Sequence, residues 1–305
     1  MKIGAIKSLR RRVLRRISRI LFPAASRQGL HAYALFSRFN ALPQLDVEVP
    51  GGNVLVLAPH MDDEVFGCGG VLAKHVQAGA QVTVVYMTDG RKGDPSIYGR
   101  PLSKQEIWKA EQGVVARRKR EAEQAARILG VQELVYLDFP DGELRSSLEA
   151  VEKLRRVLER AKPDRVYLPS LLENHIDHWQ TNCVFRDAIC NAGRTLPHFS
   201  CWGYEIWPPL YANRIVDISD VIETKKKAID LFQSQLCYVD YARGIMSLNS
   251  YRSFFHHRAK GYAEAFFSCQ PEDYLTLFRR MRASREGQRT PRVSPATDVL
   301  IDARD

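Results

Sequence analysis

Residues 53–64 read NVLVLAPHMDDE, an apolar run that ends directly in a cluster of ionisable side chains. The first six residues are mostly branched aliphatic and follow Pro50-Gly51-Gly52, so they predict a strand buried on both faces. A helical pattern over about 64–78 comes next. A buried strand that passes through a polar turn into a helix is the first part of the unit from which parallel sheets are built.

The same alternation continues along the chain. We expect further strands at 81–87, 133–137 and 165–168, and helices over 114–129, 147–161 and 180–192. The resulting fold class is α/β: a Rossmann-like, doubly wound, mostly parallel sheet with helices on both faces. Later additions to the same domain are expected as strands within 199–207 and 214–218 and a helix over about 221–235.

The polar stretch from Arg91 to Gly113 lies between two of these elements. It contains Gly, Pro and Lys and is too long for an ordinary connection, so we expect a functional loop or a cap. Three regions are predicted: a basic N-terminal arm at 1–45, the main domain at 46–282 and a flexible C-terminal tail at 283–305.

The excess positive charge of the chain is concentrated at its N-terminus. The 305 residues include 45 Lys and Arg against 35 Asp and Glu, and residues 1–45 hold ten of the basic residues and no acid. The remainder balances at 35 against 35, so no nucleic-acid-binding surface is expected on the main domain. A hydrophobic content of 45% excludes a disordered chain, and six cysteines without a C-x-x-C pair favour reduced thiols.

Residues 1–45 carry an amphipathic helical pattern, in which aliphatic side chains recur every three or four positions between Ile3 and Ile20 among arginines. Such a helix can bind an anionic membrane surface, each basic residue adding ~1 kcal/mol. A solvated or partner-packed basic helix and an organellar transit peptide are the alternatives. The expected location is cytoplasmic. Residues 1–45 add the hypothesis that the protein attaches peripherally to the cytoplasmic face of the membrane.

Two polar clusters follow predicted strands. His60-Met61-Asp62-Asp63-Glu64 comes directly after the first strand, and His175-Ile176-Asp177-His178 follows the strand at 165–168. Ligands of doubly wound sheets bind outside the carboxyl ends of the strands, so both clusters should lie on one rim. Two imidazoles and one carboxylate make a three-ligand site that leaves room for water, as catalytic zinc requires. A neighbouring free carboxylate can take a proton as that water attacks, although an Asp here could simply cap the helix.

These clusters resemble the motifs of the PIG-L/LmbE-like de-N-acetylases. APHMDDE at 58–64 is similar to the family's A-H-P-D-D-E motif, and HIDH at 175–178 is similar to its H-P-D-H motif. Members are zinc-dependent hydrolases that remove acetyl from N-acetylglucosamine units of glycolipids, thiol-glycoside precursors and antibiotics. The resemblance covers roughly residues 50–240 and extends to Thr88-Asp89-Gly90, Arg118, Glu121 and Phe139-Pro140-Asp141-Gly142.

The resemblance implies that His60, Asp63 and His178 bind one zinc ion per chain. It also implies that Asp62 is the general base and that His175 stabilises the oxyanion. On a sharp turn, adjacent Asp62 and Asp63 can face the water and the metal separately. A protonated His175 could hold the oxyanion and later pass a proton to the leaving amine, a contribution of the order of 10²–10³ in rate.

Three further residues are given roles around this centre. Asp177 is expected to orient a histidine and hold its charge. Arg118 is expected to reach the site as a substrate contact, with an exposed charge pair with Glu121 as the alternative. Asp141 is expected to hydrogen-bond sugar hydroxyls, with a turn cap beside Gly142 as the alternative.

Two departures from the family pattern leave the chemistry unaffected. Met61 and Ile176 stand where the family has proline. The two turns must then be held by packing rather than by a fixed φ. Neither position supplies a ligand.

The leading hypothesis is a zinc-dependent N-acetylglucosaminyl deacetylase whose substrate is a lipid-linked glycan, held near the membrane by residues 1–45. A deacetylase of a soluble small glycoside and a catalytically silent glycan- or lipid-binding module are the alternatives. Nucleic-acid binding through the same residues would show as affinity that collapses with salt, and it is not expected. Zinc is the expected metal, although the donor set also suits iron, cobalt or manganese.

Overall fold

The computed structural model describes residues 42–193, 196 and 198–287. From Leu45 onward these residues belong to one compact unit. The predicted arm, apart from its last four residues, lies outside the described residues. So does the predicted tail from residue 288 onward, whereas 283–287 form the end of a helix. Within the described part of the chain, no helix combines the length and apolarity needed to span a membrane.

One eight-stranded sheet forms the centre of this unit. The strand at 53–58 is buried along most of its length and pairs in parallel with two neighbours, as its apolar composition predicts. The next two pairings outward, β3 with β4 and β5 with β6, are also parallel, whereas β8 runs antiparallel to β6 and β7. The fold-class prediction is therefore confirmed, with β8 as the strand that makes the sheet mixed. The order is β1-β7-β8-β6-β5-β2-β3-β4, and the bounds are β1 Gln44–Asp46, β2 Asn53–Ala58, β3 Gln81–Thr88, β4 Glu133–Phe139, β5 Arg165–Pro169, β6 Ser200–Tyr204, β7 Arg214–Asp217 and β8 Ala263–Cys269.

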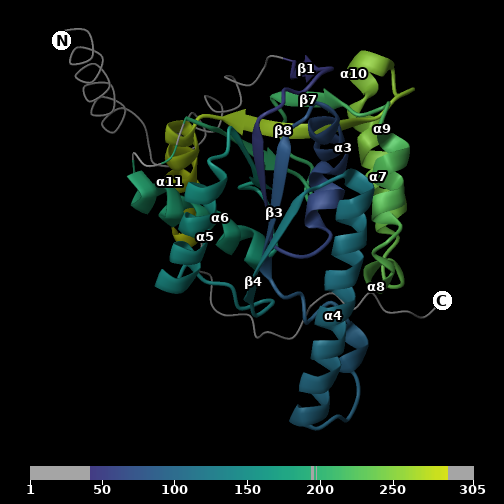
Figure 1. The fold of residues 1–305 in the computed structure, drawn as a ribbon, viewed down its shortest axis with the longest axis vertical. Coiled ribbons are helices and arrows are strands. Elements are labelled where there is room, and N and C mark those ends of the chain that lie inside the picture. The colour runs from purple at the N-terminus through teal and green to yellow at the C-terminus, as the bar shows by residue number, and fades with distance from the viewer. Residues whose placement is uncertain (1–41, 194–195, 197, 288–305) are drawn as a thin grey trace. The chain divides into compact units, whose positions relative to one another are not determined.

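Helices cover both faces of the sheet (Figure 1). Side chains alternate along β2, so that Val54 and Val56 pack with one layer of helices and Leu55 and Leu57 with the other. The first layer contains α3 Asp63–Gln77, α4 Lys104–Leu129, α7 Ile222–Ile229 and α9 Tyr241–Arg252. The second contains α5 Leu148–Ala161, α6 Ile176–Ala192 and α11 Pro271–Gly287. Shorter elements are η1 Pro95–Ile97, α8 Gln233–Leu236 and α10 Phe254–His257.

The stretch from Arg91 to Gly113 is not a continuous loop, because α4 begins ten residues before the predicted start at 114. Ser103 and Glu106 form a reciprocal capping box at this end, which stabilises the first turn. The helix expected over 221–235 is divided into α7 and α8. Helix α9, strand β8 and helix α11 were not expected from the sequence.

Helix α3 has a kink in its middle, and residues distant in sequence form hydrogen bonds with its backbone there. Cys68 has the non-helical dihedrals φ −147° and ψ 16°. The amide groups at 70–71 donate to the Glu264 carboxylate of β8 at 2.8 and 2.7 Å, which caps the second half of the helix. Lys225 of α7 donates to Glu264 at 2.6 Å and to the carbonyl of Phe66 at 2.9 Å. This buried pair fixes the turn of α3 that follows the aspartates.

Candidate functional site

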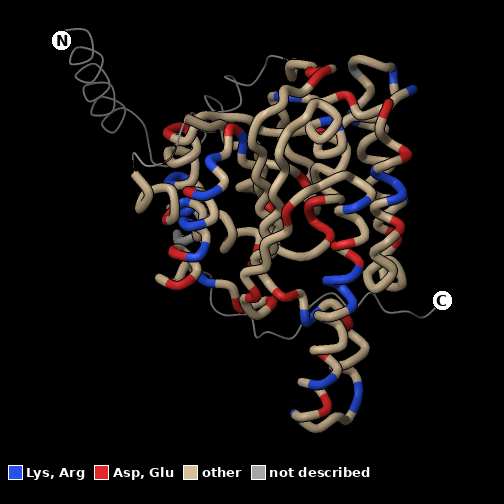
Figure 2. The backbone as a smooth tube through the Cα atoms, viewed as in Figure 1, with Lys and Arg blue, Asp and Glu red and all other residues tan. Residues whose placement is uncertain are grey.

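The predicted site residues meet where four neighbouring parallel strands end. Asp63 follows β2, Asp141 follows β4 and His178 follows β5, and Asp89, which received no role from the sequence, follows β3. Figure 2 shows acidic residues gathered at the ends of the central strands, with basic residues of α4 beside them. The two clusters predicted to share one rim of the sheet do so, since side chains of both contact His60.

The backbone at Asp62 is strained and is held by its neighbours. Asp62 has φ 150° and ψ −30°, a conformation that side-chain-bearing residues rarely adopt. Its amide donates to the carboxylate of Glu64 at 3.1 Å, and Tyr86 donates its hydroxyl to the same carboxylate at 2.7 Å. Burial raises the pKa of Glu64 to about 8. Glu64 therefore holds the turn in which Asp62 and Asp63 lie.

Arg118 of α4 points into this turn. It is 3% exposed and donates to the carbonyl of Met61 at 2.9 Å and to Asp62 Oδ2 at 3.1 Å. Its predicted alternative, an exposed charge pair with Glu121, is wrong, because Glu121 is also buried and instead accepts hydrogen bonds from Ser234. Burial raises the pKa of Asp62, and the Arg118 guanidinium acts against that increase.

Asp63 lies between two imidazoles. Its Oδ2 atom is 3.2 Å from His60 Nδ1 and 3.4 Å from His178 Nε2. Two ligand atoms bound tetrahedrally at zinc distances of 2.0–2.1 Å are separated by about 3.3 Å, so Asp63 lies at ligand spacing from each of the two histidines. The ring of His175 lies close to both histidines, with centroid distances of 4.8 Å to His60 and 5.2 Å to His178.

The other nitrogen of His60 faces two further carboxylates. His60 Nε2 is 3.2 Å from Asp177 Oδ2 and 3.3 Å from Asp141 Oδ1. The amide of Gly142 donates to Asp177 Oδ2 at 2.7 Å, so Asp141 and Gly142 do not form the isolated turn cap considered above. Asp177 lies where it can orient a histidine, and that histidine is His60. His60, Asp141 and Asp177 form one group with metal-ligand spacing, and His60, His175 and His178 form another.

Glu173 is a site residue that the sequence analysis missed. It is 1% exposed, and its Oε2 atom lies 3.4 Å from Nδ1 of His178. Its Oε1 atom accepts hydrogen bonds from the amides of Ile206 and Trp207. An acid two residues before the His175 cluster was the only available signal. Glu64 was noticed in its cluster but received no role.

The electrostatics of the centre fit a bound cation. Burial alone would lower the pKa of His178, but Asp63 raises it to about 9. Burial would likewise lower the pKa of His60, yet Asp141, Asp177 and Asp63 raise it well above its usual value. Without metal, protons on two imidazoles thus offset part of the negative charge of these carboxylates. A divalent ion carries the same charge as these two protons, so the donor set fits a metal that binds in their place.

His175 differs from the other two histidines. It precedes α6, and its Nδ1 atom accepts a hydrogen bond from the amide of Asp177 at 3.2 Å. A ring whose Nδ1 accepts from an amide carries its proton on Nε2, where it can donate while neutral. The expected protonated form is therefore not needed for His175 to donate a hydrogen bond.

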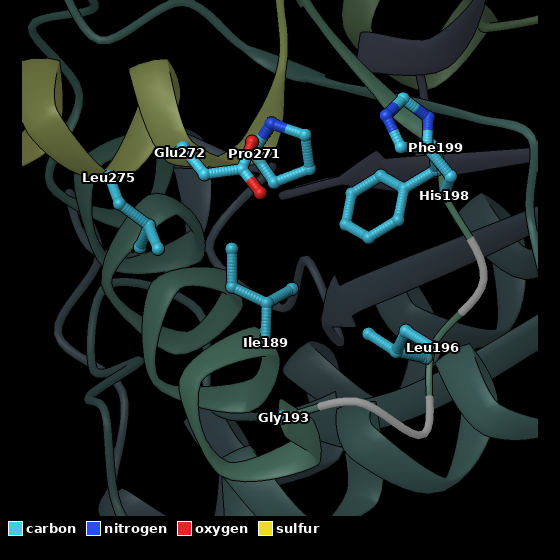
Figure 3. A pocket seen from close by; sticks show the side chains of 8 residues that line it. All are labelled: Ile189, Gly193, Leu196, His198, Phe199, Pro271, Glu272 and Leu275. Atoms are coloured by element: carbon cyan, nitrogen blue, oxygen red, sulfur yellow. The ribbon is translucent and has the colours of Figure 1, made fainter. Parts of the chain in front are cut away.

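A separate cavity of about 400 Å³ lies between the end of α6, the start of β6 and the start of α11 (Figure 3). It contains none of the predicted site residues. Its lining is mostly apolar, with the His198 ring and the Glu272 carboxylate as polar exceptions. It lies near the amino end of β6, away from the rim on which the clusters meet.

The chain is similar to known deacetylases and to a hydratase. A family model described as PIG-L: GlcNAc-PI de-N-acetylase matches residues 55–189, which include both histidine clusters. The diacetylchitobiose deacetylase of Thermococcus kodakarensis is 31% identical over 199 residues, covering 60% of this chain and 69% of that protein. A 4-oxalmesaconate hydratase of Pseudomonas putida is 30% identical over 208 residues, covering 63% and 77% respectively.

Similarity to a solved structure agrees with the family match. The N,N'-diacetylchitobiose deacetylase from Pyrococcus horikoshii, determined with an inhibitor, superposes with a TM-score of 0.60 and 27% identity. The superposition covers 72% of this chain and 85% of that structure.

Proposed function

This chain belongs to the PIG-L family of de-N-acetylases, and we propose that it is a metal-dependent hydrolase that removes acetyl from an N-acetylated amino sugar of the GlcNAc type. The observation that carries the proposal is the placement of Asp63 Oδ2 between His60 Nδ1 and His178 Nε2, with the Asp62 carboxylate held beside them by Arg118. This arrangement offers three ligands and one separate base.

We assign the metal to His60, Asp63 and His178, and zinc is the proposed ion. Bound there, it would supply Lewis-acid activation of water and of the acetamide carbonyl. Asp177 and Asp141 then accept from Nε2–H of His60, which fixes the tautomer that leaves Nδ1 free as a ligand. Glu173 has the same relation to His178 Nδ1.

Asp62 is the proposed general base. Its carboxylate takes the proton of the attacking water, and Arg118 sets its direction through the hydrogen bond to Oδ2. His175 donates from Nε2 to the carbonyl oxygen as negative charge develops there. The amine must leave with a proton, which Asp62 can return to it. The proposed substrate contacts of Arg118 and Asp141 stay predictions, since Arg118 contacts Met61 and Asp62 and Asp141 contacts His60.

Metal content tests whether the ion binds at His60 Nδ1, beside Asp63, or at His60 Nε2, beside Asp141 and Asp177. Asp63→Asn should abolish zinc retention on purification, because it removes a ligand, whereas Asp141→Asn should keep about one equivalent. The reverse pattern would move the metal to the side of Asp141 and Asp177. Elemental analysis of both proteins, with and without added iron, cobalt or manganese, also tests the identity of the ion.

Acetate release tests the activity. The purified protein should release acetate from an N-acetylglucosaminide, and Asp62→Asn should release it about 10²–10⁴ times more slowly. Two substrates are compared: N,N'-diacetylchitobiose in water and an N-acetylglucosaminyl lipid in vesicles. Release from the lipid only would support the lipid-linked substrate, release from the disaccharide only would exclude it, and release from neither would contradict the proposed function.

The membrane surface is a separate proposal based on residues 1–45 and their ten basic residues. Binding of the whole chain to vesicles with and without anionic lipid should differ strongly at low salt. Removal of residues 1–41 should abolish the binding. Equal binding to neutral vesicles would contradict this electrostatic attachment.

The relationship to the Pseudomonas putida hydratase favours a second candidate function, the metal-assisted addition of water to an unsaturated acid. Water activation by Asp62 would serve both reactions. Incubation with 4-oxalmesaconate separates them, because hydration consumes the substrate without releasing acetate.

A further inference from the structure

Trp207 is an exposed aromatic residue whose backbone is tied to the candidate metal centre. Its side chain is 52% exposed. The amides of Ile206 and Trp207 donate to Glu173 Oε1 at 2.8 and 3.3 Å, and the other oxygen of the same carboxylate lies 3.4 Å from His178 Nδ1. A single buried side chain thus separates the backbone of Trp207 from a proposed ligand.

Tyr241 connects Trp207 to the other cluster. Its ring contacts the Trp207 ring edge-on, at 5.8 Å between centroids and 70° between planes. It also stacks on Phe66 at 5.1 Å and 28°. Phe66 lies one helical turn after Asp62 in α3. Burial, followed by the carboxylates of Asp62 and Asp63, raises the pKa of Tyr241 to about 12, which agrees with a position beside the site.

The rings of Phe66, Tyr241 and Trp207 form a chain of contacts that runs from the buried Phe66, one helical turn after Asp62, to the exposed Trp207. Single exposed apolar side chains are common and need no explanation. Trp207 is different because its ring is supported on one side and its backbone is fixed by a buried carboxylate. A fixed apolar face next to polar groups suits a ligand with both kinds of surface, and a pyranose ring has an apolar C–H face and a polar rim of hydroxyls.

We propose that Trp207, supported by Tyr241, determines specificity by stacking on a pyranose ring of the substrate. The inference rests on the proposed function and deepens it, because it selects sugars over small unsaturated acids. Trp207 is a substrate-binding residue in this role, and Tyr241 is a positioning residue.

The test is the split between KM and kcat for N,N'-diacetylchitobiose. Trp207→Leu should raise KM about tenfold and change kcat less than threefold, because the variant loses the stacking contact but none of the groups assigned to the chemistry. Trp207→Phe should restore most of the affinity. Tyr241→Leu should raise KM by a smaller factor.

Trp108→Leu is the matched control. Trp108 is 59% exposed on α4, and it lies ten residues, or about 15 Å of helix, from Arg118. Its removal should leave KM unchanged. An equal rise of KM in both leucine variants would overturn the proposal, as would a Trp207→Leu variant that loses kcat at constant KM.

Calorimetric titration of the same disaccharide into Asp62→Asn protein separates this inference from the proposed function. Binding that weakens about tenfold when Trp207→Leu is added supports the subsite, even if the wild-type protein releases no acetate. Binding that is unaffected by Trp207→Leu overturns the subsite, even if acetate is released. Absence of any binding overturns it as well.

Discussion

Residues 53–192 and residues 200–287 contribute to the same sheet in different ways. The first region repeats strand and helix, and its four strands β2 to β5 pair in parallel. The second places β8 antiparallel between β6 and β7. All residues assigned to the chemistry come from the first region. The second supplies Lys225, Glu264, Trp207 and Tyr241, which support or extend that chemistry.

The reactive side chains therefore lie in the first region, and residues of the second region hold them in place. The reactive groups follow directly from strand ends, whereas their positions depend on contacts from residues more than 100 positions away, such as Glu264 to Gly70. Substitutions of the reactive groups in the first region should change rate without changing stability. Substitutions of the supports in the second region should change stability first.

The largest expected effect is that of Asp62→Asn on catalysis. Loss of a general base should lower kcat by about 10²–10⁴, while the unfolding midpoint and zinc content stay close to wild type. Steady-state acetate release, denaturant unfolding and metal analysis measure the three quantities. A variant that lost its zinc would show that Asp62 supports the metal site and is not a separate base.

The next effect is that of Lys225→Met on stability. The substitution leaves Glu264 buried without its cation and should lower the free energy of unfolding by about 3–5 kcal/mol. Lys225→Met combined with Glu264→Gln should regain part of the loss, because no buried charge remains unpaired. Urea unfolding of the three proteins checks this, and a loss below about 1 kcal/mol in the single variant would refute the role of the pair.

A smaller effect is the pH dependence contributed by His75, a buried residue of α3 near the amino end of β2. Burial lowers its pKa to about 4, and it contacts the Pro50 carbonyl and the Tyr167 hydroxyl. The unfolded chain, with a pKa near 6.5, binds the proton more readily. Stability from neutral His75 is therefore complete above about pH 6.5 and is lost as the pH falls towards 4.

Between pH 7 and 5 this linkage amounts to about 2 kcal/mol. His75→Gln removes the titrating group and keeps a polar side chain. From pH 7 to pH 5, the free energy of unfolding of this variant should therefore fall by about 2 kcal/mol less than that of the wild-type protein. Unfolding curves of both proteins at pH 7, 6 and 5 give the comparison. Parallel pH profiles would show that His75 does not titrate as described.

The smallest effect concerns the capping box of α4. Ser103→Ala removes the side-chain acceptor for the Glu106 amide and should destabilise the first turns by about 1 kcal/mol. Amides of the first turns should exchange about fivefold faster with solvent. Ser147→Ala at the start of α5 is the matched cap, and it should alter α5 only. Unchanged exchange in α4 would mean that packing, rather than the cap, holds this end.

Much of the first region could be predicted from sequence. Strands at 53–58, 81–88, 133–139 and 165–169 lie where apolar runs predict them, because both faces of each strand are covered by helices. The start of α4 could not be found in this way. Its first three turns are mostly exposed and polar, so they lack the apolar period on which the prediction depends.

The sequence alone determined the α/β class, the two histidine clusters and their position after strands. Apolar runs predict buried strands, and the spacing within each cluster involves only residues that are close in sequence. Only the tertiary structure decided that Arg118 holds Asp62, that His60 faces acids on both ring nitrogens, and that Glu173 joins His178 to Trp207. These contacts join residues from different strands and helices. Burial makes them strong, and burial of a polar side chain is a property of the packed fold rather than of its neighbours in sequence.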